Sequence, residues 1–77
     1  MAAAAYAAID LGASSGRVLC GAFDGERITL TEHRRFPNRP VRLPDGLRWD
    51  VLGLFAQSVA CLRDAGPLAG VGVDTWG

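Results

Sequence analysis

The stretch AIDLGASSGR at residues 8–17 constrains the fold of this chain more than any other. A short apolar run without helical periodicity, residues 6–11, delivers one carboxylate, Asp10, and leads into five small residues, 12–16. Such a run is typical of a central strand that enters a tight turn. Residues 17–23 then alternate in the manner of a second strand, which we expect to be covered on both faces. The chain therefore opens with two strands joined by a turn whose side chains are too small to pack.

A third strand is predicted over residues 27–36, with a water-exposed tail that contains His33. The preceding Asp24-Gly25 pair favours a two-residue type I′ turn, because that turn needs positive φ. Three prolines, an Asp-Gly pair and three arginines follow within residues 37–48. This composition predicts a loop with an extended arm and no regular element.

A helix is predicted from an N-cap at Asp50 through Arg63, because apolar residues recur at three- and four-residue spacing. Those residues are Val51, Leu54, Phe55, Val59 and Leu62, and Gly66-Pro67 ends the helix. A last strand over residues 71–74 again ends in a carboxylate, Asp74. A strand reached through a helical crossover returns parallel and right-handed. If it pairs with the first strand, Asp10 and Asp74 emerge at the same carboxyl edge, where ligands bind in open α/β sheets.

The small turn and its flanking charges fit a metal-nucleotide site. Backbone N–H groups of such a turn can face outward and bind anionic oxygens, and Ser14, Ser15 and Arg17 add further donors. Asp10 suits a Mg²⁺ ion held largely through water. The turn is neither a Walker A loop nor GxGxxG, because no Gly-Lys-Ser/Thr follows and it leads into a strand. The alternative is a plain hairpin loop with an ion pair between Asp10 and Arg17 across it.

Composition narrows the classes of partner and location. Eight basic residues, all arginine, balance eight acidic ones, so no field that would gather nucleic acid or anionic lipid follows. The first nine residues lack a basic segment and stop short of a signal peptide or membrane span, which predicts a cytoplasmic protein. Cys20 and Cys61 have no metal-binding spacing and are expected to be small buried hydrophobes. Trp49 and Trp76 are expected to be core or loop anchors.

Residues 10–17, Asp-Leu-Gly-Ala-Ser-Ser-Gly-Arg, resemble the first phosphate motif of the FGGY carbohydrate kinases. Ala13 stands where that family usually has Thr, and this form is similar to the rhamnulokinases in particular. Trp49-Asp50 before the helix and Val73-Asp74-Thr75-Trp76-Gly77 at the end agree with that branch. The resemblance implies an α/β fold, the β-β-β-α-β start of a ribonuclease H-like domain of the actin, Hsp70 and hexokinase type. Residues 1–77 would be an incomplete N-terminal portion of kinase domain I.

The resemblance also implies roles for individual residues. The ATP phosphates would be cradled by Ala13, Ser14, Ser15, Gly16 and Arg17. Asp10 would hold Mg²⁺ and Gly77 would line the sugar pocket, with Asp74 and Trp76 as nearby supports. The implied reaction transfers the γ-phosphoryl group of ATP to the 1-hydroxyl of L-rhamnulose.

The general base of the family lies far downstream, so no residue of this chain is catalytic and the 77 residues alone are expected to be inactive. Other readings of the same residues are another FGGY ketose kinase, an ATP-binding switch of the actin and Hsp70 superfamily, and an α/β fragment without activity.

Overall fold

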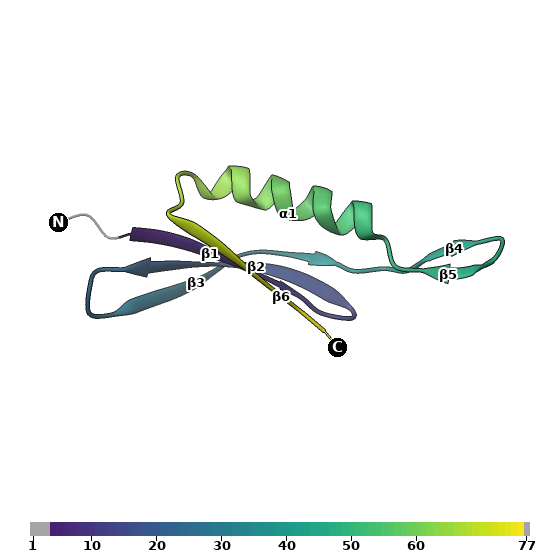
Figure 1. Ribbon diagram of the computed structural model, residues 1–77, viewed down its shortest axis with the longest axis horizontal. Helices are drawn as coiled ribbons and strands as arrows, with labels where there is room; N and C mark the ends of the chain where they lie inside the picture. Colours follow the sequence, from purple (N-terminus) through teal and green to yellow (C-terminus); the bar gives the residue numbers. More distant parts are fainter. Residues whose placement is uncertain (1–3, 77) are drawn as a thin grey trace.

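The computed structural model describes residues 4–76, an elongated α/β unit of 55 × 22 × 15 Å. In order along the chain, its elements are β1 (Ala4–Leu11), β2 (Ser15–Phe23), β3 (Ile28–Pro37), β4 (Val41–Leu43), β5 (Gly46–Arg48), α1 (Val51–Ala65) and β6 (Gly70–Thr75). Figure 1 shows α1 lying along one face of the main sheet, with the β4–β5 hairpin projecting beyond it. Residues 4–76 include no helix with the length and hydropathy that a membrane span requires.

The main sheet has four strands in the order β3-β2-β1-β6. The first three are antiparallel neighbours, and β6 returns parallel to β1 after the α1 crossover. The predicted pairing of the last strand with the first is therefore confirmed, and Asp10 stands directly opposite Asp74.

The turn at Asp24 differs from the type I′ prediction. Phe23 pairs with Ile28, so the loop holds four residues, and among the described residues only glycines have positive φ. The Oδ1 atom of Asp24 accepts hydrogen bonds from the backbone N–H groups of Glu26 (2.9 Å) and Arg27 (2.8 Å). This side chain organises the loop as an Asx-type turn, which removes the need for positive φ at Asp24 itself.

Residues 37–48, predicted to lack a regular element, instead form the two-stranded β4–β5 sheet. Leu43 pairs with Gly46, so Pro44 and Asp45 form the tip of the hairpin, and Gly46 adopts φ 132°. Pro40 and Pro44 both lie just outside the strands. The prediction was wrong because proline is excluded only where a strand must donate a hydrogen bond.

Helix α1 begins as predicted. The Asp50 side chain accepts a hydrogen bond from the Gly53 N–H group (2.9 Å), and Gly66 lies just past the helix with φ 82°. The buried side of the helix is formed by Leu54, Ser58 and Cys61, whereas Val51 and Phe55 are mostly exposed. The predicted apolar stripe instead lines an open hollow between α1 and β6, together with Val71 and Val73.

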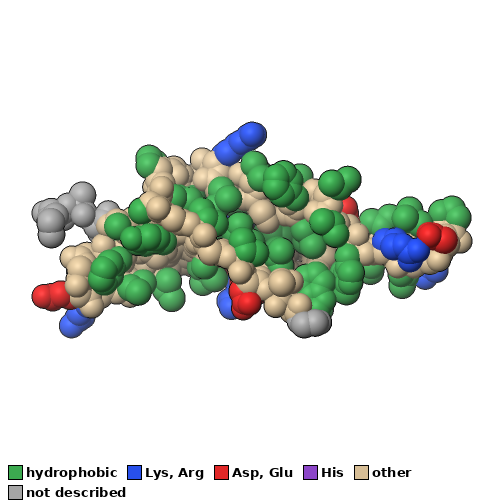
Figure 2. Space-filling model, viewed as in Figure 1, with side chains coloured by type: hydrophobic (Ala, Val, Ile, Leu, Met, Phe, Trp, Pro, Cys, Tyr) green, Lys and Arg blue, Asp and Glu red, His purple; other side chains and the backbone are tan. Residues whose placement is uncertain are grey.

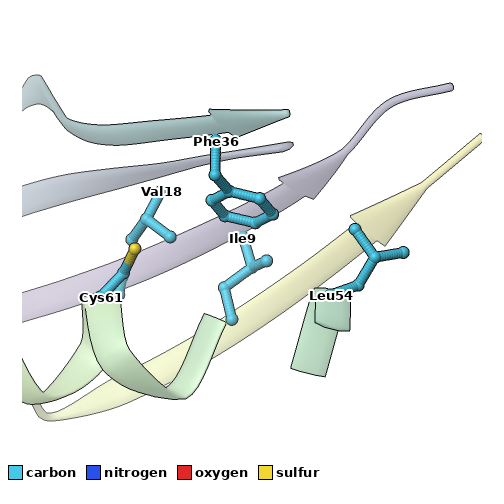
Figure 3. Packing of buried hydrophobic residues seen from close by; sticks show 6 residues of the cluster. Ile9, Val18, Phe36, Leu54 and Cys61 are labelled. Atoms are coloured by element: carbon cyan, nitrogen blue, oxygen red, sulfur yellow. The ribbon is translucent and has the colours of Figure 1, made fainter. Parts of the chain in front are cut away.

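The core lies between α1 and the face of the sheet beneath it. It contains Ala7, Ile9, Val18, Phe36, Leu54 and Cys61, with Leu11, Leu62, Leu68 and Trp76 packed around them. Figure 3 shows Cys61 of the helix facing Val18 and Ile9, with the Phe36 ring beside them. Both cysteines are free; Cys61 is buried as expected, and Cys20 is half-buried.

The opposite face of the sheet is open, contrary to the expectation that β2 is covered on both sides. Leu19 and Gly21 of β2 line a shallow apolar hollow with Tyr6, Phe23, Ile28 and Leu30. Ile28 and Leu30 are 66% and 64% exposed. Figure 2 shows hydrophobic side chains over much of the side of the molecule in view. The single helix α1 covers only one face of the sheet. The apolar side chains on the other face, which the sequence predicted to be buried, therefore remain in contact with solvent.

His33, expected to face solvent, is half-buried. Leu19 pairs with Glu32 and Val18 pairs with Arg34, so His33 is the extra residue of a β-bulge in β3. Its Nε2 atom is buried and has no hydrogen-bond partner among residues 4–76.

Candidate functional site

The small turn joins β1 to β2 at the carboxyl end of β1. The Gly12 N–H group donates to the Ser15 carbonyl at 2.9 Å, which closes the turn. Ala13 and Ser14 at its tip are exposed and Ser15 is half-buried. In the described part of the chain, the N–H groups of Ala13 and Ser14 donate no hydrogen bond. The tip therefore presents unpaired backbone donors to solvent, which is the property expected of an anion-binding turn.

Gly16 has a different environment, since it is buried beneath the Phe36 ring. A Cβ atom at Gly16 would overlap the Cε2 and Cζ atoms of that ring. The absent side chain at this position is therefore required by packing in the core, whatever the turn binds. At Gly12 a Cβ would lie 2.9 Å from the Ser15 carbonyl oxygen, so the turn itself requires glycine there.

Asp10 and Arg17 flank the turn as direct neighbours on β1 and β2. Arg17 Nε donates to Asp10 Oδ2 at 3.0 Å, and the two side chains are 42% and 39% exposed. The ion pair of the alternative interpretation is thus present. It engages one carboxylate oxygen and one of the guanidinium nitrogens, and the other polar atoms of both groups remain available to a ligand.

The pair belongs to a row of charges that crosses the whole sheet. Asp74 of β6 is opposite Asp10, Asp10 is opposite Arg17, and Arg17 is opposite Arg35 of β3. Residues paired across neighbouring strands share one face, so all four side chains rise from the face away from α1. The row has two carboxylates on one side and two guanidinium groups on the other, next to the turn.

Arg35 was not among the residues predicted for the site. Counting from the Phe23–Ile28 pair places Arg34 opposite Arg17, but the bulge at His33 shifts the register by one residue. A one-residue shift exchanges the faces of the strand. Arg34 consequently lies on the helix side, where its Nη2 atom is 2.6 Å from Asp64 of α1. Arg35 Nη2 lies 2.7 Å from Glu32 Oε1, and a small hollow beside Arg35 reaches Ser14 and Ser15.

The C-terminal segment predicted for the site, residues 73–77, meets the β1–β2 turn segment at the end of β6. The backbone N–H group of Trp76 donates to the Leu11 carbonyl at 3.2 Å, which extends the hydrogen bonding between β1 and β6 beyond Thr75. The Trp76 ring packs edge-on against Trp49, with 4.6 Å between the ring centroids, and Trp49 remains exposed. Gly77, predicted to line a sugar pocket, lies outside the described residues.

A divalent cation would find two carboxylates here, Asp10 and Asp74, on neighbouring strands. The described residues contain no group of three or more metal-ligating side chains. A site with two carboxylates suits Mg²⁺, which usually keeps several waters and takes one or two carboxylates plus substrate phosphates.

Comparison with known proteins gives a consistent result. The chain is 34% identical over 76 residues to the rhamnulokinase of Bacteroides thetaiotaomicron, and this match covers 94% of the chain and 16% of the relative. It is 40% identical over 74 residues to the rhamnulokinase of Halalkalibacterium halodurans, covering 90% of the chain and 15% of the relative. The rhamnulokinase of Bacillus subtilis is 35% identical over 75 residues. No protein-family model matches the chain.

The resemblance to rhamnulokinases predicted from two short motifs is therefore confirmed over nearly the whole chain. The chain spans about a sixth of the length of these curated relatives, 16% in the first of them.

Proposed function

We propose that this chain is the N-terminal portion of domain I of an FGGY sugar kinase that phosphorylates the 1-hydroxyl of L-rhamnulose with ATP. Similarity to curated rhamnulokinases supports a kinase role in rhamnose metabolism. The observation that carries the proposal is the charged row Asp74-Asp10-Arg17-Arg35 beside a turn with free N–H groups. The domain would be ribonuclease H-like, and the protein cytoplasmic, without nucleic-acid or membrane partners.

The turn would hold the phosphates of ATP. The N–H groups of Ala13 and Ser14 are free among the described residues, and Ser14 and Ser15 add hydroxyl groups to the same turn. Arg17 supplies a positive charge that is already positioned by Asp10. A hydrogen bond to a charged group contributes about 1.5–3 kcal/mol, so three or four such contacts would suffice for micromolar affinity. Gly16 would belong to the cradle as the β2 residue that follows Ser15, although it is buried beneath Phe36.

Asp10 would hold Mg²⁺, with Asp74 beside it as a support. When bound, this ion neutralises phosphate charge during transfer. The ion pair with Arg17 holds the Asp10 carboxylate at the edge of the turn. There it would lie close to the phosphates and bind the metal ion without contacting the phosphates directly.

The proposed reaction forms a bond between the sugar 1-oxygen and the γ-phosphorus and breaks the bond from that phosphorus to the β,γ-bridging oxygen, which leaves with ADP. Positioning and charge neutralisation supply most of the catalysis in such transfers. The hydroxyl proton must pass to a general base, and no residue of this chain is assigned to that role. Gly77 would leave room for a sugar hydroxyl to approach the backbone.

The test is an ADP-release assay on the full-length protein with MgATP and L-rhamnulose, compared with L-fuculose, D-xylulose and glycerol. We expect turnover with L-rhamnulose to exceed turnover with the others, and no turnover by residues 1–77 alone. A preference for a different ketose would reject the substrate, and ATP hydrolysis indifferent to every sugar would favour the ATP-binding switch. Turnover by the 77 residues would contradict the absence of a base.

A further inference from the structure

Asn38 is buried at a position where its neighbours in the sequence are exposed. It directly follows β3 and is only 4% exposed, between exposed Pro37 and Arg39. Among the described residues, Asn38 and Ser58 are the buried polar ones, and Ser58 is satisfied within its own helix by the Leu54 carbonyl (2.7 Å). Asn38 instead makes its hydrogen bonds to the β1–β2 turn, 26 residues away in the sequence.

Two carbonyl groups of the turn are held by Asn38. Its side-chain Nδ2 donates to the Gly12 carbonyl at 2.8 Å, and its backbone N–H group donates to the Ser14 carbonyl at 3.0 Å. These two contacts grip the turn on both sides of its exposed tip. The sequence-based prediction of the site did not include Asn38.

These contacts set the orientation of two N–H groups of the turn, the free donor of Ala13 and the N–H group of Ser15. In a trans peptide the carbonyl and the following N–H group lie in one plane and point in opposite directions. A Gly12 carbonyl held toward Asn38 therefore turns the Ala13 N–H group away from Asn38. The Ser14 carbonyl, held in the same manner, turns the Ser15 N–H group away. A flip of either peptide would instead present an oxygen to the anion.

We infer that Asn38 is a positioning residue for the nucleotide phosphates: it fixes the Gly12–Ala13 and Ser14–Ser15 peptide planes so that the N–H groups of Ala13 and Ser15 face the anion. This inference rests on the proposed function of the turn. Asn38 does not touch the phosphates; it acts through Gly12 and Ser14.

The unused half of the side chain supports the same role. Asn38 Oδ1 is buried and accepts no hydrogen bond from residues 4–76. A buried amide with one unsatisfied end is unfavourable for folding. The donor end is the part that reaches the turn, so a substitution that keeps the approximate size and removes the amide isolates the contribution of the Nδ2 donor.

The decisive variant is Asn38→Leu in the full-length protein. It keeps the approximate size and the backbone contact to Ser14, adds no charge, and removes the donor to the Gly12 carbonyl. We expect the Kd and KM for MgATP to rise about tenfold, the effect of losing one hydrogen bond, and the KM for the sugar to change less than twofold. Ser58→Ala is the matched control, since it removes the other buried polar group, which donates to the Leu54 carbonyl of its own helix and not to the turn, and it should leave both KM values unchanged.

Equal changes in both KM values, or no change in the Kd for MgATP, would overturn the role of Asn38. If the wild-type protein binds MgATP but phosphorylates no sugar, the proposed kinase activity is rejected. The effect of Asn38→Leu on the Kd for MgATP still tests the role of Asn38 in that case. Should the variant not fold, NMR of the wild-type protein labelled with ¹⁵N decides it. The Asn38 side-chain NH₂ group must be protected from exchange while MgATP shifts the Ala13 amide resonance, and an unprotected NH₂ group or an unmoved Ala13 amide overturns the inference.

Discussion

Arg17 Nε lies 3.0 Å from Asp10 Oδ2, and the two residues face each other across β1 and β2. The pair is partly exposed on both sides, so solvent screens it and its contribution to stability is small, about 0.2–1 kcal/mol for pairs of this kind. The pair has two possible roles, stabilising the fold and binding a ligand through its unused polar atoms. Because its contribution to stability is small and it lies beside a turn with free N–H groups, ligand binding explains it better. Removal of either partner separates the two explanations.

Asp10→Ala should reduce the turnover of the full-length protein by about 10²–10³-fold, because an electrostatic group aimed at the reacting charges contributes on that scale. Its free energy of unfolding should fall by less than about 1 kcal/mol, as expected for an exposed pair. Steady-state kinetics and urea unfolding measure the two quantities. Asp45→Ala, which breaks the exposed Asp45–Arg48 pair of the β4–β5 hairpin, is the control and should leave turnover unchanged. An unchanged rate for Asp10→Ala would remove Asp10 from the mechanism.

Gly16→Ala should destabilise the fold by about 1–3 kcal/mol, the usual cost of forcing extra volume into a packed core. The new methyl group would overlap the ring of Phe36, which is buried. Chemical unfolding of the variant measures the loss. Gly72→Ala on β6 is the matched control, because a Cβ there meets no atom within 4 Å.

The role of Phe36 in this loss has its own check. Adding Phe36→Leu to Gly16→Ala should restore part of the stability, because contacting residues couple in a double-mutant cycle. Equal stability of Gly16→Ala and Gly72→Ala would show that the ring moves aside without cost.

The parts of the structure set by neighbouring residues were predictable from the sequence. The strand ending in Asp10, the small turn, the Asp50 cap and the parallel return that aligns Asp74 with Asp10 all follow from local patterns and from the handedness of crossovers. The β4–β5 hairpin was missed because strands of three residues show no usable alternation.

Features that depend on an irregular register, on a single side-chain contact or on a missing partner were not predictable. The position of Arg35 in the charged row depends on one bulge residue, His33, and the sequence near it contains no glycine to mark a bulge. Asn38 reaches the turn through a contact between residues distant in the sequence, so no spacing rule finds it. The exposure of the sheet face away from α1 was also not predictable. Apolar residues in a strand indicate that a face tends to be covered, but they do not show whether the covering element is present.

Cys61 should react with iodoacetamide far more slowly than Cys20 in the folded protein. Burial raises the pKa of the Cys61 thiol, so less of the reactive thiolate is present at a given pH, and the group is also fully covered. Cys20 is half-buried. Mass spectrometry of the labelled peptides over time measures both rates, and in urea the two should converge. Equal labelling of the two cysteines under native conditions would show that the helix opens from the sheet readily.

Asp24 should titrate below its ordinary pKa of 3.8 in the folded protein. The N–H groups of Arg27 and Glu26 donate to its carboxylate and lower the pKa, since they favour the charged form. With a folded pKa below the unfolded one, the stabilisation is fully present above pH 3.8 and is lost as the pH falls through the folded pKa. NMR titration of the Asp24 carboxyl carbon measures this pKa directly. Asp24→Asn keeps an acceptor oxygen but does not titrate, so its stability relative to wild type should improve as the solution is acidified. A measured pKa of 3.8 or higher would mean that the turn does not hold the carboxylate in solution.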